Sequence, residues 1–492
     1  MKKNSQDNDK VIVKLKKEYL SSERKENKYK GLCIFLSIVL GASFIIILLL
    51  MNFNVASTIF GNVLDEDNTK TNEIKDILKD KWVYGNDYQD LDDTLDEKMY
   101  YGMTSFEEDP YTTYMSADDM DYFSNSIDKI QLGIGVSYYK EYNGYPYVIE
   151  TFKDSGAYNA GIKKGDRLIS IDGVSTLGLS DDQIKEVVLG DEGTYVLIEV
   201  LRNDQKIKYE CERKYFDSTA HVSLNGDVVI LTLSSFGSNT VQTISNELKD
   251  YTNYHKLIID LRNDTGGYQD ALLKIAALFL DNDTLVMKEI DKNGNETKYY
   301  ADYDEHYYNF DDIVIITNEN TASAAEVFAI CMKEQHPNTT LLGTETFGKG
   351  VVQTSIRLKD DSYLKVTISY WTSPNGVPLK DSGIKPDIEV TLDDAFYYAK
   401  YDFPKDTIYE YDSVSSYVQF VQLMLKYLGY PISRTDGYFD ISLKNAINMY
   451  KANNGLSADG KLDETTYEKI YDTFYLYDRD DQLSAALELI NK

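Results

Sequence analysis

The feature that most constrains this chain is an unbroken charge-free run from Gly31 to Met51 ("GLCIFLSIVLGASFIIILLLM"). A helix needs about 20 mainly apolar residues to cross the hydrocarbon core of a bilayer, and this run is long enough. The segment 1–30 before it carries ten Lys/Arg against five Asp/Glu, and such a positive flank stays in the cytoplasm. The run predicts an uncleaved anchor with everything after Met51 exported. A signal peptide cleaved near Val55-Ala56-Ser57 is only a minor alternative. The basic segment and the apolar run of a typical signal peptide are shorter than those found here.

The exported part is strongly acidic. Of the chain's 51 basic and 81 acidic residues, 41 and 76 follow residue 30, which gives a net charge of −35. This charge argues against nucleic acid and anionic lipid as partners. The only cysteines are Cys33, Cys211 and Cys331, too few for a disulfide framework or a cysteine zinc cluster. We expect neither a metal nor a cofactor.

The chain predicts a multidomain α/β protein. Its 492 residues correspond to roughly three domains, and strands alternating with helices indicate a mostly parallel sheet. The predicted order is a cytoplasmic basic segment (1–30), the transmembrane anchor (31–51), a helical region (52–126), a β domain (127–214), an α/β core (215–400), a linker (401–413), a small three-helix domain (414–472) and a C-terminal tail (473–492).

Ser323 stands where a predicted strand gives way to a predicted helix. The apolar run Ile313–Ile316 precedes it, and good helix formers extend from Ala322 to Lys333. Ser323-Ala-Ala-Glu326 fits a capping box, and taken alone this favours a structural cap. However, active groups of α/β sheets gather at strand carboxyl ends, and the stretch 263–267 also follows a strand. Ser323 is therefore a candidate for chemistry as well.

Other local motifs say less. Lys349 lies between two glycines in "TFGKGVVQ", which alone is typical of a turn with a solvated lysine and lacks the P-loop spacing. The four histidines, His221, His255, His306 and His336, have no motif context, so a Ser/His/Asp hydrolase is not favoured. A metal-dependent wall hydrolase is not favoured either, because no H-E-x-x-H or close His/Asp cluster is present.

Several motifs together resemble the C-terminal processing peptidases, or tail-specific proteases. They are "DPYTTYM" (109–115), "DLRNDTGG" (260–267), "NTASAAE" (320–326), "TFGKGVVQ" (346–353) and "SPNGVPL…GIKPDIEV" (373–390). The resemblance implies a Ser/Lys dyad with Ser323 as nucleophile, Lys349 as general base and Gln353 orienting the lysine. The chain departs from the family pattern in three ways. Thr265 stands where proline is common, and the nucleophile run, which is usually serine-rich, contains one serine. The gap between Ser323 and Lys349 is also one residue longer than usual.

This dyad has clear physical requirements. A serine hydroxyl needs a neighbouring base, and a solvated lysine with a pKa of about 10.4 holds its proton. Burial lowers that pKa, and the amide of Gln353 orients the amine without adding negative charge. The start of the Ser323 helix can also stabilise an oxyanion. The candidate donors are the N–H of Ala324 and one N–H from Gly266 or Gly267.

Two flanking segments resemble binding domains. Residues 127–214 resemble a PDZ domain through "AGIKKGDRLISIDG" (160–173), which implies that the loop Leu132-Gly133-Ile134-Gly135 binds a peptide carboxylate. The alternative for this loop is a glycine bulge in an ordinary strand. Residues 414–472 resemble a peptidoglycan-binding domain, and the alternative is a bundle that packs on a neighbouring domain.

The sequence thus predicts a membrane-anchored, extracytoplasmic serine endopeptidase that recognises protein C-termini. Its expected partners are protein or peptide substrates, peptidoglycan and, through the single helix, the membrane; a homo-oligomer stays open. The predicted location is the cell membrane of a bacterium with a Gram-positive type of envelope, with the N-terminus in the cytoplasm. The alternative function is a non-catalytic PDZ scaffold tethered to the wall.

Overall fold

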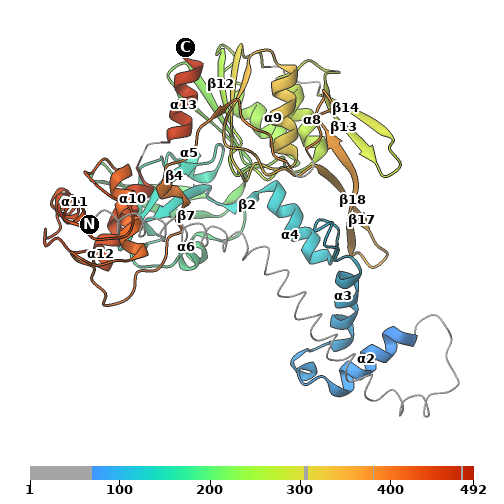
Figure 1. Cartoon of the computed structure of the whole chain (residues 1–492), viewed down its shortest axis with the longest axis horizontal. Coiled ribbons are helices and arrows are strands. Elements are labelled where there is room, and N and C mark those ends of the chain that lie inside the picture. The colour runs from blue at the N-terminus through green and yellow to red at the C-terminus, as the bar shows by residue number, and fades with distance from the viewer. Residues whose placement is uncertain (1–68, 304–307, 380–381, 478–479) are drawn as a thin grey trace, which may run out of the picture. The chain divides into compact units, whose positions relative to one another are not determined.

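The computed structural model describes residues 69–303, 308–379, 382–477 and 480–492, and the chain divides after Met103 into two compact units (Figure 1). The predicted cytoplasmic segment 1–30 and the anchor 31–51 lie outside the described residues. Within those described, no helix has the length and apolar character that a membrane span requires. The described part of the first unit is helical, as predicted, and contains α2 (Thr69–Lys81), the 3-10 turn η1 (Gly85–Asp87) and α3 (Leu91–Met103).

The second unit opens with β1 (Thr113–Met115) and α4 (Ala117–Asp128) and continues into an antiparallel β domain. The sheet of this domain has the order β3-β4-β5-β7-β8, with β6 paired to β5, so β3 is an edge strand. A separate ribbon pairs β2 with β9. The elements are β2 (Ile130–Gly133), β3 (Val136–Lys140), β4 (Pro146–Thr151), α5 (Gly156–Ala160), β5 (Arg167–Ile171), β6 (Val174–Ser175), α6 (Asp181–Val188), β7 (Tyr195–Arg202), β8 (Gln205–Glu212) and β9 (Lys214–Asp217).

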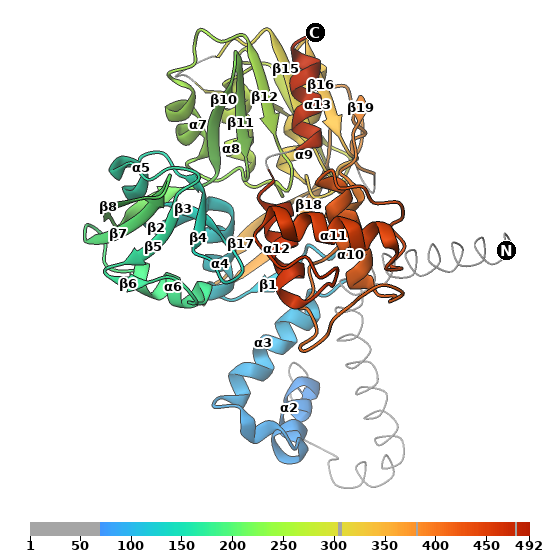
Figure 2. The ribbon, with the colours of Figure 1, turned by 90° about the vertical axis from the view of Figure 1, so that its left-hand side faces the viewer.

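A six-stranded sheet forms the predicted α/β core (Figure 2). Its order is β10-β11-β12-β15-β16-β19, and every pair except β10–β11 is parallel. The central strands are continuous apolar runs because helices cover both faces. The strands are β10 (Ala220–Asn225), β11 (Val228–Leu233), β12 (Lys256–Asp260), β15 (Asp312–Thr317), β16 (Thr339–Gly343) and β19 (Ile388–Glu389); the helices between them are α7 (Thr240–Leu248), α8 (Gln269–Ala277) and α9 (Ala324–Gln335).

A second, antiparallel sheet stands beside the core and brings distant segments together. Its order is β1-β18-β13-β14, and β17 also pairs with β18. Thus β1, from the start of the unit, lies against a strand that comes much later in the chain. The strands are β13 (Leu285–Asp291), β14 (Glu296–Tyr300), β17 (Val351–Arg357) and β18 (Tyr363–Thr372).

The predicted three-helix domain forms its own apolar core. It contains α10 (Ser416–Tyr427), α11 (Ile441–Asn453) and α12 (Glu464–Tyr475), preceded by the 3-10 turn η2 (Asp394–Tyr397). The domain also touches the β domain, because Asp472 accepts hydrogen bonds from the Tyr139 hydroxyl at 2.7 Å and the Tyr142 N–H at 2.8 Å.

The segment 473–492, expected as a tail, belongs instead to two folded elements. Its first residues end α12, and residues 481–490 form α13 (Asp481–Ile490). Leu483, Ala486 and Ile490 lie on one helical face, which packs on the sheet side formed by Val228, Ile230, Ile258, Val314, Ile316 and Leu342. Figure 1 shows α13 on the side of β12 opposite α8 and α9. The last helix therefore completes the α/β core.

Candidate active site

Ser323 lies between β15 and α9, at the N-cap position of the helix. Its backbone has φ 58° and ψ −121°, a region that non-glycine residues rarely adopt and that costs of order 1–3 kcal/mol. Its N–H donates to Oε2 of Glu326 at 2.9 Å, as in a capping box, and the residue also lines a cleft. The cap position and the predicted nucleophile are thus one residue.

Glu326 ties the Ser323 turn to the Lys349 loop. Its side chain is completely buried. Oε2 accepts the N–H groups of Ser323 and Lys349, both at 2.9 Å, while Oε1 accepts the Thr346 hydroxyl at 2.5 Å and the Gly348 N–H at 2.8 Å. Four donors satisfy this buried carboxylate, as a charge in the interior requires. The sequence suggested only a capping role for Glu326, because the loop that it holds comes well after the helix in the chain.

Lys349 is half-buried in the loop that ends two residues later at the start of β17. The pKa of its amine is lowered to about 8, mainly by burial and to a smaller extent by the nearby positive charge of Lys365. The negative charge of Glu326 acts in the opposite direction. Nζ lies 4.9 Å from the centroid of the Tyr111 ring, and the backbone carbonyl accepts the indole N–H of Trp371 at 2.8 Å. The lysine is therefore held in place and titrates where a general base can work.

Tyr111 reaches the site through a turn that Asp109 organises. Oδ1 of Asp109 accepts the Tyr111 N–H at 3.1 Å and the hydroxyl of Thr367, on β18, at 3.0 Å. These bonds join a loop near the start of the unit to the strand beside β17. The motif "DPYTTYM" contributed to the family resemblance, but its role above Lys349 depends on a contact between segments that are far apart in the sequence.

Gln353 lies on β17 and lines the same cleft as Ser323 and Lys349. Its Nε2 is buried and has no hydrogen-bond partner among residues 69–303, 308–379, 382–477 and 480–492. The amide therefore has unused capacity toward Lys349 or a substrate. A buried amide without a partner is costly, which is typical of a functional group rather than a packing residue.

The two candidate glycines of the oxyanion hole differ in what their N–H groups do. The N–H of Gly266 donates to Oδ1 of Asp264 at 2.8 Å, whereas in the described part of the chain no partner is found for the N–H of Gly267 or Ala324. A Cβ added at Gly266, which has φ +93°, would lie 2.7 Å from the Ala324 nitrogen and 2.9 Å from the Ser323 Cβ. The backbone thus lies directly against the nucleophile, and Ala324 with Gly267 is the better donor pair.

Asp264, on the same loop, was not singled out by the sequence. Its side chain is fully buried, and Oδ2 has no partner within the described ranges. Burial raises its pKa to about 8, with the Gly266 hydrogen bond acting in the opposite direction. Asp264 is therefore a neutral acid over much of the physiological range, and no local motif predicts this state.

These residues converge on a cleft of about 500 Å³. It is lined by the candidate residues that the sequence singled out for catalysis and the oxyanion hole: Ser323, Ala324, Gly266, Gly267, Lys349 and Gln353. Its apolar wall is formed by Leu272, Met287, Val327, Val352 and Trp371. Helix α4 borders it with Met120, Phe123, Ser126 and Ile127. The cleft therefore has an apolar wall near the candidate nucleophile.

The predicted carboxylate loop lies outside this cleft, between β2 and the edge strand β3. Gly135 has φ +73°, and a Cβ there would lie 2.2 Å from the Ser155 Cβ, so only glycine fits. The carbonyls of Ile134 and Gly135 accept the N–H groups of Ala157 and Phe152 at 2.8 and 3.1 Å. Leu132 and Gly133 belong to β2. The loop therefore precedes a strand edge to which a peptide could add.

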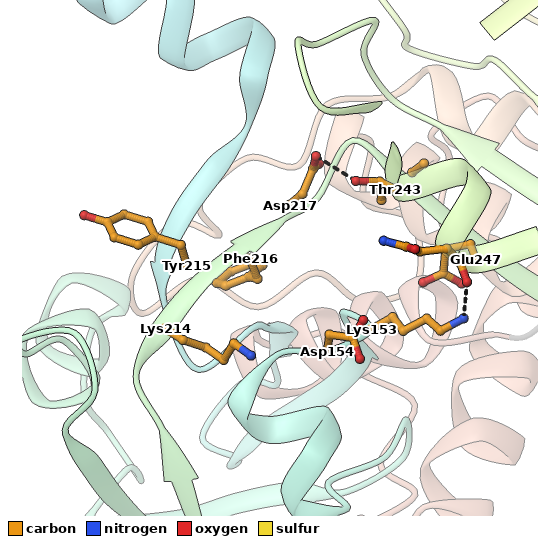
Figure 3. Close-up of a pocket in the computed structure, with 10 residues that line it drawn as sticks. Lys153, Asp154, Lys214, Tyr215, Phe216, Asp217, Thr243 and Glu247 are labelled. Carbon is orange, nitrogen blue, oxygen red and sulfur yellow. Dashed lines mark hydrogen bonds between the residues drawn. The ribbon is translucent and has the colours of Figure 1, made fainter. Parts of the chain in front are cut away.

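A second cavity of about 190 Å³ lies where β9 passes toward the core (Figure 3). Lys153 donates to the carbonyl of Asn246 at 2.7 Å, and Thr243 donates to Asp217 at 2.9 Å. Lys214, on its wall, is the register partner of Gly133. The cavity borders the ribbon that carries the predicted carboxylate loop, but none of the predicted catalytic residues lines it.

The chain was then compared with known proteins. The model of peptidase family S41 matches residues 227–390, a PDZ model matches 153–202 and a peptidoglycan-binding domain model matches 415–470. A protein of Staphylococcus epidermidis named "Probable CtpA-like serine protease" is 32% identical over 93% of this chain and 93% of its own length. The chain belongs to peptidase family S41.

A second relative agrees with this membership. A Staphylococcus haemolyticus protein of the same name is 30% identical over 96% of this S41 peptidase and 95% of that protein. The predicted family and the serine-type peptidase activity are confirmed by the family model and these relatives. A solved structure titled photosystem II D1 C-terminal processing protease is also similar, at 19% identity and a TM-score of 0.38 over 67% of this chain and 94% of that one.

Proposed function

We propose that this S41 peptidase is a membrane-anchored, extracytoplasmic endopeptidase that cleaves proteins near their C-termini through a Ser323/Lys349 acyl-enzyme mechanism. One observation carries the proposal. Ser323 and Lys349, which belong to separate segments of the sequence, donate to the same buried oxygen of Glu326 and line the same cleft. This arrangement holds a hydroxyl and a lysine of lowered pKa on adjoining turns.

In the first step, the neutral amine of Lys349 accepts the proton of the Ser323 hydroxyl as Oγ attacks the scissile carbonyl carbon. The carbonyl electrons move to oxygen, where the N–H groups of Ala324 and Gly267 stabilise the negative charge. Loss of one such donor costs roughly 3–4 kcal/mol in a well-studied hydrolase. Gln353 orients the lysine through its amide.

In the second step, the tetrahedral intermediate collapses and the C–N bond breaks. The ammonium of Lys349 donates its proton to the leaving amine, which regenerates the neutral base. Water then attacks the ester carbonyl of the acyl-enzyme while Lys349 accepts a proton from it. The second tetrahedral intermediate then collapses, the bond between the acyl carbon and Oγ breaks, and the ammonium of Lys349 returns its proton to the Ser323 oxygen as the new carboxyl terminus leaves.

Recognition of C-termini is assigned to the PDZ domain. The loop from Leu132 to Gly135 precedes β3, whose outer edge has no strand partner in the described sheet. A peptide that adds to such an edge gains backbone hydrogen bonds, and a glycine loop lets its carboxylate approach closely. This geometry supports capture of a tail by one domain and cleavage by another.

The location follows from the sequence. The charge-free run 31–51 with its basic flank supports an anchor, and the peptidoglycan-binding domain match at 415–470 supports contact with the wall. Two attachments raise the effective concentration of the peptidase at the envelope. Peptidoglycan and exported proteins are therefore the proposed partners.

The test uses the full-length protein in detergent and a disordered protein with an apolar C-terminal tail. We expect Ser323→Ala and Lys349→Ala to lose about a thousandfold or more in kcat, whereas Ser223→Ala, on an exposed part of β10, retains the parent rate. Cleavage by Ser323→Ala at the parent rate would show that the nucleophile is misassigned. If the parent binds tails but cleaves none, protein C-termini are ligands of the PDZ domain and are not the substrates of the peptidase.

A further inference from the structure

Lys365 is a second lysine in the catalytic cleft, and the mechanism above does not use it. It lies on β18, is half-buried and lines the cleft together with Ser323 and Lys349. Its Nζ lies 4.6 Å from the centroid of the Phe123 ring on α4. Burial lowers the pKa of its amine. Such a cation in a peptide-binding cleft calls for an anionic partner.

Within the described residues, no carboxylate lies within ion-pair distance of Lys365. Two other partly buried cations of this unit do have one: Arg202 pairs with Asp166 at 2.6 Å and Lys400 pairs with Glu468 at 2.6 Å. The chain has 81 acidic residues against 51 basic ones, so acidic partners are abundant. The position of Lys365 therefore leaves its charge available to a bound molecule.

The strand register gives the offset of Lys365 from Gln353 along the cleft. Gln353 pairs with Thr367 and Ser355 pairs with Lys365 across β17 and β18. Alternate residues of a strand share a face and rise about 3.3 Å each, so Lys365 lies roughly 7 Å beyond the Gln353 level on the same face. Ser355 also lines the cleft and supplies a hydroxyl donor beside the ammonium.

We propose that Lys365 and Ser355 form a subsite that binds a carboxylate of the peptide substrate about two residues from the scissile bond. An extended peptide has the same rise as the strands beside it, which gives this offset. The inference rests on the proposed endopeptidase function. The carboxylate has two possible sources, the C-terminus of a short tail and an aspartate or glutamate side chain.

The test compares matched peptides with the full-length enzyme. One series carries two, three or four residues after the scissile bond and ends in a free acid or an amide. The other is amidated and places Asp or Asn at successive positions on either side of the bond. We expect the parent to prefer the carboxylate by about tenfold to a hundredfold in kcat/KM in one series and position, since hydrogen bonds to charged groups have this effect.

Lys365→Met must remove that preference, and Lys365→Arg must keep most of it. Because Lys365 also affects the pKa of Lys349, the preference is expressed for each enzyme as the ratio of kcat/KM for the charged and the neutral peptide at one pH of about 7.5, so that the protonation of Lys349 affects both rates alike and cancels. Lys359→Met is the control, since this exposed lysine lies in the turn between the same two strands. The comparison also separates an effect of Lys365 from carboxylate binding by the PDZ domain, because the PDZ domain is the same in the parent and the variant.

Three outcomes decide the matter. A carboxylate preference lost in Lys365→Met but kept in Lys359→Met supports the subsite, and the series that shows it identifies the source. A preference near one in the parent, or one unchanged in Lys365→Met, overturns the subsite while Ser323-dependent cleavage still supports the proposed function. If Ser323→Ala cleaves the neutral peptides like the parent, the proposed function itself fails. Should Lys365→Met not fold, loss of the parent's preference at high ionic strength is the second measurement.

Discussion

Ser323 and Lys349 donate their backbone N–H groups to the same oxygen, Oε2 of Glu326, each at 2.9 Å. The distance between the predicted nucleophile and the predicted base is thus fixed through the backbone and not only through their side chains. The strained φ of Ser323 is held by the same bond. A buried carboxylate with four donors makes this geometry rigid, which catalysis by proximity requires.

Glu326→Gln tests this arrangement. Glutamine replaces one acceptor oxygen by a donor, which then faces N–H groups that need an acceptor. We expect kcat to fall about a hundredfold or more. The free energy of unfolding should fall by roughly 2–5 kcal/mol. Steady-state kinetics and urea unfolding measure the two effects.

Glu334→Gln is the matched control on the same helix. Glu334 accepts the Ser373 hydroxyl at 2.7 Å and the Asn375 N–H at 2.8 Å, away from the dyad. This variant is expected to lose some stability while its kcat stays close to the parent value. An equal loss of kcat in both variants would mean that Glu326 acts on the fold alone.

The pH dependence of kcat/KM should report the titration of Lys349. Because the base acts in its neutral form and its pKa is lowered to about 8, activity rises with pH through about 8. Lys365→Met removes a positive neighbour, so the ammonium form of Lys349 is repelled less and its pKa rises. The acid limb of the kcat/KM profile then moves to higher pH. Rates for an amidated, uncharged peptide from about pH 6 to about pH 10 measure this.

Lys349→Arg is expected to be nearly inactive at every pH, because arginine does not lose its proton in this range. An acid limb near the ordinary histidine pKa, unmoved by Lys365→Met, would point to another base.

How much of this site could be predicted depends on the range of the contacts. Ser323, Lys349 and Gln353 follow from short motifs, and the strands around them follow from unbroken apolar runs. Glu326 was visible only as a capping residue, because its second set of donors comes from the loop at 346–349. Asp109 accepts a hydrogen bond from Thr367, and Arg262 donates one to Asp480. In each pair the two residues lie far apart in the sequence. Such pairings are set by tertiary packing and leave no local pattern.

Asp264→Asn is predicted to change the pH dependence of stability. An unfolded aspartate has a pKa near 3.9, whereas burial raises that of Asp264 to about 8. Between these values the folded state retains a proton that the unfolded state has lost, so this contribution to stability falls as pH rises. Asparagine removes the titration and keeps an oxygen for the Gly266 N–H.

We therefore expect the stability difference between Asp264→Asn and the parent to grow from about pH 4 to about pH 8, by at most about 1.4 kcal/mol per unit. Thermal unfolding across this range measures it. Asp227→Asn is the control: its hydrogen bond to Lys256 lowers the pKa of Asp227, so its contribution to stability changes only below the unfolded pKa, and the difference from the parent should stay constant across this range. A difference that does not depend on pH would show that Asp264 is ionised in the folded protein.

Asp480→Ala is predicted to weaken the attachment of α13. Arg262 donates to Asp480 at 2.6 and 3.0 Å and to Asp260 at 2.6 and 2.9 Å, and it is mostly buried. Removing the Asp480 carboxylate leaves the guanidinium with Asp260 and, at 3.2 Å, the Gln482 amide oxygen as acceptors, at a cost of roughly 1–3 kcal/mol. Urea unfolding measures the loss, and Glu488→Ala, exposed on the same helix, is expected to leave stability unchanged.

The position of α13 determines how the peptidoglycan-binding domain must be removed. Truncation after Tyr477 would expose the apolar sheet face around Ile230, Ile258 and Val314, so we expect an aggregated, inactive protein.

Excision of 415–475, with a Gly/Ser linker of about 20 residues joining Val414 to Leu476, keeps α13. We expect this variant to hydrolyse a small soluble protein within about twofold of the parent rate, because the cleft contains no residue from the excised part. In detergent, it should no longer sediment with purified wall sacculi. Equal sedimentation of parent and variant would assign the three-helix domain to packing against the PDZ domain, through Asp472 and Tyr139, and not to the wall.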